Sequence, residues 1–275
     1  MAGNLYIVAT PIGNLEDISL RALRILKEVD LIAAEDTRRT KKLLAHYDIT
    51  TPLTSYYDEI EREKAAELVK QLQNGKTIAL VSDAGTPTLS DPGFRLVREA
   101  IRAGLPVVPV PGASALLAVL SASGLPTDRF VFEGFLPAKR RERREKLQTL
   151  AKEPRTLVFY EAPHRLSATL GDMLEIFGDR EAVFGREVTK AFEEFVRGSL
   201  SEALAAVGRK EPRGEITLGV AGFAGEASPV DAEIDSEIAN LLDKGLRVKE
   251  IAEILGEKFG HPKKDIYRMV LERQK

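Results

Sequence analysis

The stretch KTIALVSDAGTPTLSDPGFRLVREA, residues 76–100, holds the pattern that decides the fold. Its apolar run at 77–81 breaks into the small polar segment SDAGTP (82–87), and after a second turn, SDPG (90–93), the chain resumes with a helical pattern. A short buried strand followed by a helix is the repeating unit of a parallel sheet. The small polar residues between them predict a ligand-binding loop at the carboxyl end of a buried strand.

The same alternation of short apolar runs and amphipathic stretches extends over the first 120 residues. The predicted strands are 5–9, 31–34, 77–81 and 106–110. The predicted helices are 18–28, 37–46, 60–74 and 94–103. This order indicates a mainly parallel sheet with helices on its faces. The next segment, PGASALLAVLSASGLP (111–126), predicts a small-residue helix packed closely on that sheet.

The pattern changes after Gly124-Leu125-Pro126-Thr127, where adjacent strands follow one another without a helix between them. Such an order predicts a mixed sheet. The segment GFAGEASP (222–229) loses periodicity and predicts a linker, and the tail beyond it is helical. We therefore expect an α/β protein with a mainly parallel domain at 1–123, a mixed-sheet domain at 124–225, and a small helical helix-turn-helix-like module at 226–275.

Composition narrows the classes of function. The formal net charge of -2 argues against a uniformly basic coat for nucleic acid, so any such contact must come from a local patch. The absence of cysteine excludes disulfides and thiolate chemistry, and three histidines far apart in sequence argue against a metal site. No signal peptide and no apolar run near the ~20 residues of a membrane span are found. We expect a cytoplasmic protein with no metal and no membrane contact.

Four loops follow predicted strands and share a small, polar, Gly- and Pro-rich composition. They are TPIGNLED (10–17), AEDTRRT (34–40), SDAGTP (82–87) and PVPGAS (109–114). Each alone could be a tight turn, but together they offer backbone N–H groups, hydroxyls and carboxylates around one cleft for a polar small molecule. No G-x-x-x-x-G-K-[ST] and no G-x-G-x-x-G after a strand occurs, which argues against a P-loop or dinucleotide site.

The densest basic run is AKRRERREK, residues 138–146. It predicts phosphate contacts beside the cleft, although Glu142 and Glu145 also permit ion pairs on a solvated helix. Two more arginines flank a strand-end loop, and another follows the strand near 160. The candidate nucleic-acid contacts of this part of the chain are Arg38, Arg39, Arg140, Arg141, Arg144 and Arg165.

The tail alternates helical segments with breaks, in the spacing of a helix-turn-helix bundle. Its last helix presents Lys263, Lys264 and Arg268. Such a module usually recognises nucleic acid, and the alternative is a plain dimerisation or packing unit.

Four long motifs carry a family resemblance. They are LYIVATPIGNLEDISLRALRILKEVDLIAAEDTR (5–38), LVSDAGTPTLSDPG (80–93), VPVPGASALLAVLSASGLP (108–126) and LVFYEAPHR (157–165). In order and spacing they resemble the small-subunit ribosomal RNA methyltransferases of the tetrapyrrole methylase-like superfamily, from about Leu5 to Ala221. The resemblance implies two α/β domains, S-adenosylmethionine bound in the cleft between them, a homodimer, and 2′-O-methylation of a cytidine ribose in 16S rRNA near the decoding centre.

The resemblance also implies which residues hold the methyl donor. Two departures, TPIGN at 10–14 and FYEA at 159–162, speak against a tetrapyrrole substrate and agree with the ribosomal RNA branch. The alternatives are a methyltransferase of this fold acting on a tetrapyrrole or a protein side chain, and a non-catalytic RNA-binding protein. The implied donor-binding residues are Pro11, Ser82, Asp83, Thr86, Ser114, Ala115, Tyr160 and Glu161.

The catalytic base stays open at the level of sequence. A ribose hydroxyl is a poor nucleophile at neutral pH and benefits from a group that takes its proton. A desolvated lysine or a carboxylate near the cleft can do so. Asp36 can instead cap the helix that follows it, and Glu161 can pair with Arg165. The candidates for base or orienting group are Lys190, Glu187 and Glu35.

Overall fold

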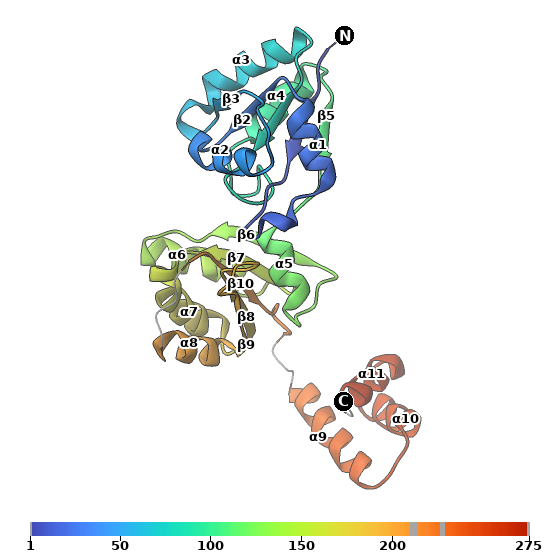
Figure 1. Cartoon of the computed structure of the whole chain (residues 1–275). Coiled ribbons are helices and arrows are strands. Elements are labelled where there is room, and N and C mark those ends of the chain that lie inside the picture. The colour runs from blue at the N-terminus through green and yellow to red at the C-terminus, as the bar shows by residue number, and fades with distance from the viewer. Residues whose placement is uncertain (1, 210–213, 226–228, 274–275) are drawn as a thin grey trace. The chain divides into compact units, whose positions relative to one another are not determined.

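The structure is a computed structural model, shown in Figure 1, and it describes residues 2–209, 214–225 and 229–273. The chain forms two compact units, Met1–Phe223 and Ala224–Lys275. The first unit contains two five-stranded sheets. The second unit is helical.

All strands of the first sheet run parallel, as the sequence predicts. Their order is β3-β2-β4-β1-β5. The bounds are β1 Leu5–Val8, β2 Leu31–Ala34, β3 Leu53–Ser55, β4 Ile78–Val81 and β5 Val107–Val110. The edge strand β3 was not predicted, because its three residues, LTS, contain no apolar run.

Helices cover both faces of this sheet and bury their apolar stripes on it. Ala22, Ile25 and Leu26 of α1 recur at helical spacing and pack with Leu44 of α2 on one face. Leu68 and other apolar residues of α3 pack with α4 on the opposite face. The bounds are η1 Leu15–Asp17, α1 Leu20–Glu28, α2 Thr37–His46, η2 Asp58–Ile60, α3 Glu61–Gln73 and α4 Phe94–Arg102.

The connections leave the neighbouring strands β1 and β4 in opposite directions, toward β2 and β5. Ligands of open parallel sheets bind in the crevice at such a switch point. Here Thr10 N donates to Gly85 O at 2.8 Å and Gly85 N donates to Thr10 O at 3.0 Å, so the two strand-end loops are bridged. Gly85 has a φ of +83°, a left-handed conformation that favours glycine. Two of the four predicted loops thus meet at one point.

The second sheet is mixed, which confirms the prediction. Its order is β6-β7-β10-β8-β9, with β6 and β7 parallel and the other pairs antiparallel. The bounds are β6 Phe130–Phe135, β7 Thr156–Glu161, β8 Glu181–Arg186, β9 Glu194–Ser199 and β10 Ile216–Val220.

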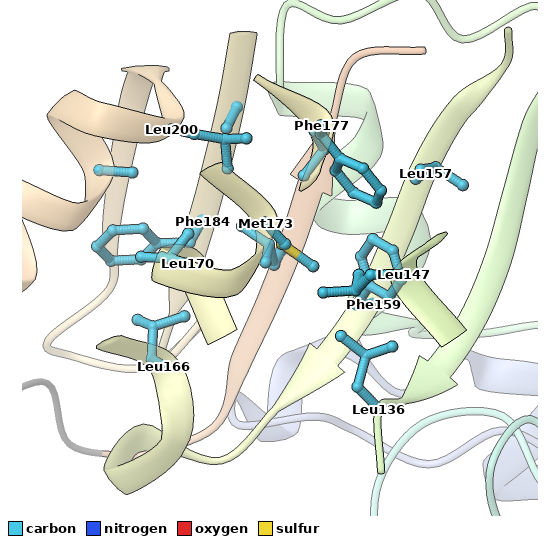
Figure 2. Packing of buried hydrophobic residues seen from close by; sticks show 14 of the residues in the cluster. Leu136, Leu147, Leu157, Phe159, Leu166, Leu170, Met173, Phe177, Phe184 and Leu200 are labelled. Atoms are coloured by element: carbon cyan, nitrogen blue, oxygen red, sulfur yellow. The ribbon is translucent and has the colours of Figure 1, made fainter. Parts of the chain in front are cut away.

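One face of the second sheet packs against three helices. Figure 2 shows Leu166, Leu170 and Met173 of one helix packed with Phe159 and Phe184 of the strands. Burying a side chain of this size stabilises the fold by about 1.5–3 kcal/mol relative to leaving it exposed. The helices are α6 Arg140–Leu150, α7 Pro163–Phe177 and α8 Leu200–Arg209.

The helix α5, Ala115–Ala122, corrects one expectation. It packs chiefly on β7 and β10 of the second sheet, and not on the first sheet as predicted. Its Leu116 and Leu120 cluster with Val158 of β7. The cause is its composition, ALLAVLSA, which is apolar on most sides and so does not specify which sheet it covers. The domain division at residue 123 stays a prediction.

The second unit is a bundle of α9 Pro229–Asp243, α10 Val248–Phe259 and α11 Lys263–Arg273. Its core contains Ile234, Ile251, Leu255 and Ile266. The helices of this tail confirm the predicted helical module. The predicted linker and the boundary at 225/226 fall partly on residues 226–228, which lie outside the described residues. Within the described ranges, no helix is both long and apolar enough to cross a membrane.

Candidate functional site

A main cavity of about 400 Å³ lies beside the loop after β4. The ends of β7 and β10 from the second sheet complete its wall. It therefore brings together loops that are far apart in sequence. Of the predicted site residues it gathers Glu35, Arg39, Asp83, Thr86, Ser114, Ala115, Tyr160 and Glu161.

A second, smaller cavity of about 300 Å³, called here the side chamber, adjoins the first. Pro11, Lys42 and Lys190 line it. Both cavities share Ile12, Arg39, Asp83, Ala84 and Glu215, so they have a common wall. Two ligands bound in the two cavities would meet across these residues.

Asp83 ties the strand-end loops together. Its Oδ1 accepts from the backbone N of Asp36 at 3.0 Å, and its Oδ2 lies 3.2 Å from Arg39 Nη1. Its own backbone N donates to Glu35 Oε2 at 3.1 Å. Because β2 and β4 are neighbours, one side chain can hold both loops. Ser82 lies just before it, buried, and its O accepts from Thr10 Oγ1 at 3.2 Å.

Asp36 serves α2 rather than the cavity, which confirms the capping alternative. Its Oδ1 accepts from Arg38 N at 2.8 Å at the start of the helix. Hydrogen bonds from the Arg38 side chain and backbone hold the pKa of Asp36 well below its usual range. The Arg38 guanidinium also pairs with this carboxylate at 2.8 Å and is 88% exposed.

Two carboxyl groups of the main cavity have raised pKa values. Burial raises the pKa of Glu35, and the charges of Asp83 and Asp58 act in the same direction. Burial also raises the pKa of Asp91 to about 6, aided by the charges of Glu35 and Asp83 and opposed by a hydrogen bond from Ser82. Raised values make these carboxylates better proton acceptors near neutral pH.

Sequence reasoning missed Asp91, which was interpreted only as part of the SDPG turn. The structure turns it into the cavity through a loop in which Thr88 and Ser90 have positive φ values of 75° and 65°. Non-glycine residues seldom adopt this conformation, and the residue types threonine and serine do not predict it. Leu89, Phe135 and Glu215 of the cavity wall were missed for the same kind of reason.

Replacing Asp91 by asparagine is expected to stabilise the protein at pH 8 and to leave stability at pH 3 unchanged. Because its folded pKa, about 6, exceeds the ordinary 3.8, its contribution to stability is present below 3.8 and lost as the pH rises through 6. The expected gain at pH 8 is about 1–2 kcal/mol, or a few degrees in Tm. Thermal unfolding at both pH values measures it. Asp128→Asn, at an exposed position, is the control, and an equal shift at both pH values would contradict the assignment.

Both carboxylate oxygens of Glu161 have partners within the protein, and the predicted pairing of Glu161 with Arg165 is confirmed. Its Oε2 accepts from Thr169 Oγ1 at 2.6 Å, its Oε1 accepts from Ala162 N at 2.8 Å, and Arg165 Nε lies 3.2 Å away. Arg165 also donates to the backbone oxygens of Leu136 and Pro137. The guanidinium therefore joins the ends of β6, β7 and α7, which favours a structural role over an RNA contact.

Tyr160 belongs to an aromatic wall. Its ring lies 4.9 Å from that of Phe132 and 5.6 Å from that of Phe135, measured between centroids. Burial raises the pKa of its hydroxyl. Phe135 is 57% exposed although it lines the cavity, so an apolar face is available to a planar ligand.

Lys190 and Glu187 lie in the loop between β8 and β9. Lys190 Nζ donates to Glu187 Oε1 at 2.9 Å and lies 3.5 Å from Glu215 Oε2. Burial alone would lower the pKa of Lys190, but these two carboxylates outweigh it and raise the pKa. The hydrogen bond from Lys190 lowers the pKa of Glu187. Both groups are thus held charged, and a charged ammonium cannot take a proton from a substrate.

The basic run of α6 is engaged in ion pairs. Asp172 of α7, 2% exposed, accepts from Arg140 at 3.1 Å, Arg143 at 2.8 Å and Arg144 at 3.1 Å. Arg141 pairs with Glu145 at 2.9 Å, as the solvated-helix alternative predicts. The remaining cations of the run, Lys139 and Lys146, pair with Glu142 and Glu133. The run fixes α6 to α7, and its contact with RNA stays a prediction.

The basic residues predicted in the tail lie on α11. Lys263 pairs with Glu253 of α10 at 2.7 Å, and Arg268 lies 3.6 Å from Asp265. Lys264 is exposed. Their role in RNA binding stays a prediction. Among the residues that the structure describes, no group of three or more His, Asp or Glu side chains could hold a metal ion.

Comparison with known proteins adds to this geometry. The family model of tetrapyrrole (corrin/porphyrin) methylases matches residues 4–204. A protein of Pseudomonas aeruginosa named ribosomal RNA small subunit methyltransferase I is 50% identical, over 99% of this chain and 98% of its own. A Synechocystis protein of the same name is 50% identical, over 98% of each chain.

Among solved structures, uroporphyrin-III C-methyl transferase from Thermus thermophilus, complexed with S-adenyl homocysteine, superposes with a TM-score of 0.55. It is 24% identical, over 80% of this chain and 97% of its own, a likeness that concerns the fold alone. The relatives and the family model match this chain by sequence, over nearly its whole length and over residues 4–204 respectively. The chain belongs to the tetrapyrrole (corrin/porphyrin) methylase family and, within it, to the ribosomal RNA small subunit methyltransferase I group.

Proposed function

We propose that this protein transfers a methyl group from S-adenosylmethionine to the 2′-hydroxyl of a cytidine ribose in 16S rRNA, near the decoding centre of the small ribosomal subunit. The observation that carries the proposal is the main cavity at the switch point, in a chain 50% identical to a relative named ribosomal RNA small subunit methyltransferase I. A cytoplasmic location and a homodimer belong to the same proposal. A tetrapyrrole acceptor is not favoured, because the loops at 10–14 and 159–162 depart from that branch.

The residues of the main cavity fit the proposed donor. When bound, S-adenosylmethionine supplies an electrophilic methyl group on a cationic sulfonium. The carboxylates of Glu35, Asp83 and Asp91 line the cavity and would stabilise positive charge there. Tyr160 and Phe135 offer an apolar face for a planar base. The small residues Ala84, Gly85, Thr86, Ser114 and Ala115 would let the ligand approach the backbone.

We assign the proton acceptor to Glu35. Its Oε2 already accepts from Asp83 N, which leaves Oε1 for the proton of the acceptor hydroxyl. Its pKa is raised by burial, as a base working near neutral pH requires. Lys190 then serves as a positioning residue that lines the side chamber, and Glu187 holds it there through their ion pair, which keeps both groups charged.

The experiment that tests the function uses labelled S-adenosylmethionine and small ribosomal subunits from a strain that lacks the modification. We expect label on one cytidine ribose of 16S rRNA, found by nuclease mapping and lost when the hydroxyl is replaced by deoxyribose in a reconstituted subunit. Label on a base, on protein or on no component would overturn the proposal.

Replacing Ser114 by phenylalanine is expected to abolish donor binding without unfolding the protein. Ser114 lines the main cavity at the start of α5, so a phenyl ring there would occupy the space of the ligand. We expect at least about 100-fold weaker binding of S-adenosylmethionine, a loss of about 2.7 kcal/mol. Calorimetry measures it. Ser121→Phe, on an exposed position of the same helix, is the matched control and should bind normally.

A further inference from the structure

The helix α2 presents four basic side chains to solvent, Arg38, Arg39, Lys41 and Lys42, called here the α2 basic face. The helix buries Thr40 and Leu44 on its other side, so all four cations lie on its outward surface. It begins directly after the carboxyl end of β2, beside the main cavity. The basic face therefore stands at the rim of the proposed catalytic site.

The cations of α2 differ from those of α6 in their partners. Each cation of the α6 run pairs with a carboxylate. On α2, Arg38 pairs with Asp36 and Arg39 with Asp83, while Lys41 and Lys42 have no ion pair among the described residues. An unpaired lysine at the surface can neutralise a phosphate without first breaking an internal ion pair. The free positive charge near the site is thus on α2.

Part of the α2 basic face lines the side chamber. Arg39 and Lys42, one helical turn apart, both line it, and Lys190 from the second sheet's β8–β9 loop lines it too. Its two carboxylates, Asp83 and Glu215, already face Arg39 and Lys190 at 3.2 and 3.5 Å. Lys42 is left to meet a ligand. A cavity of about 300 Å³ is at the lower end of the range for small-molecule sites, and one nucleotide is a ligand of that class.

We propose that the α2 basic face is the surface that docks the RNA backbone, with Lys42 contacting the phosphate of the nucleotide held in the side chamber. Lys41 and Arg38 then contact the adjoining phosphates on the outward side of the helix. This inference rests on the proposed function, because it takes the side chamber as the seat of the acceptor nucleotide. Glu35 lines the main cavity and not the side chamber, so the ribose of that nucleotide would reach Glu35 and the donor across the common wall of the two cavities.

The test compares two double variants of the full-length protein that remove the same charge. Lys41→Gln with Lys42→Gln changes the α2 basic face, and Lys139→Gln with Arg141→Gln changes two exposed, ion-paired cations of α6. The probe is the unmodified small ribosomal subunit, bound at several salt concentrations. For the α2 variant we expect the slope of log K against log salt to fall by about 1.5 and affinity at 0.1 M salt to fall about 30-fold.

The controls separate this inference from the proposed function. Calorimetry should give the same affinity for S-adenosylmethionine in the wild type and both variants. The α6 variant should keep the wild-type salt slope, a result that would also remove Arg141 from the predicted RNA contacts. A wild type that methylates the subunit beside an α2 variant with unchanged slope, or two variants with equal losses, would overturn the docking surface and leave the function standing. A wild type that neither binds nor methylates the subunit would overturn both.

Discussion

Replacing Asp83 by alanine is expected to weaken binding of S-adenosylmethionine by about 100-fold and to abolish methylation. The carboxylate accepts from Asp36 N, faces Arg39, and lines both cavities. Its loss removes two charge-assisted contacts between the loops after β2 and β4 and one negative charge from the proposed sulfonium site. A change of that size corresponds to about 2.7 kcal/mol, within the range of about 2–5 kcal/mol for removing one partner of a buried charge pair. Calorimetry with the donor measures it directly.

Asp83→Asn is the matched control, because an amide oxygen can still accept from Asp36 N but cannot pair with Arg39. We expect it to recover part of the affinity. A double-mutant cycle with Arg39→Gln then apportions the remainder between the ion pair and the donor. Donor affinity equal to that of the wild type in Asp83→Ala would exclude this residue from the donor site.

Replacing Asp172 by alanine is expected to destabilise the first unit by about 3–5 kcal/mol. Asp172 is 2% exposed and Arg143 is 5% exposed, so the change leaves a guanidinium buried without its main partner. Burial alone would raise the pKa of Asp172, but hydrogen bonds from Arg143, Arg144 and Arg140 outweigh it and lower the pKa. Urea unfolding of variant and wild type measures the loss.

The pH dependence of this loss follows from the direction of the shift. A carboxyl group with a lowered folded pKa contributes stability above its ordinary value of 3.8, and this stability is lost as the pH falls through the folded value. The penalty of Asp172→Ala should therefore be constant between pH 5 and 8. Glu175→Gln, at a 57% exposed partner of Arg140 and Arg144, should cost less than about 1 kcal/mol. The double variant Asp172→Leu with Arg143→Met should recover most of the stability lost in Asp172→Ala. Equal destabilisation in Asp172→Ala, Glu175→Gln and this double variant would contradict a buried unpaired charge as the cause.

Much of the first sheet could be predicted from local pattern. The bounds of β2 and α2 agree with the prediction at both ends, because apolar periodicity and the Asp36 cap are local signals. Strand β3 could not be predicted, because a strand of three residues is defined by its pairing with β2 and not by the pattern of its own side chains. The sheet on which α5 packs could not be predicted, because a helix that is apolar on most sides does not specify the sheet that it covers.

The site residues that directly follow a strand could be predicted from the sequence. Those that reach the cavity through an unusual backbone conformation could not. Asp83, Thr86 and Ser114 follow directly from strand ends and line the main cavity. Asp91 and Phe135 reach it through a strained loop and a register shift in β6, and neither feature has a sequence signal. The basic run of α6 misled for another reason. Its partner Asp172 lies about thirty residues further along the chain, so the ion pairs cannot be predicted from the local run of charges.

The position of β10 bears on how the protein is made. It is the last strand of the first unit along the chain, yet it lies at the centre of its sheet, between β7 and β8. On the ribosome, the parallel sheet can close as soon as β5 has emerged, whereas β6–β7 and β8–β9 must wait as separate edges until residues 216–220 leave the exit tunnel. A nascent chain stalled before that point would expose two unpaired strand edges and become a substrate for chaperones or for aggregation.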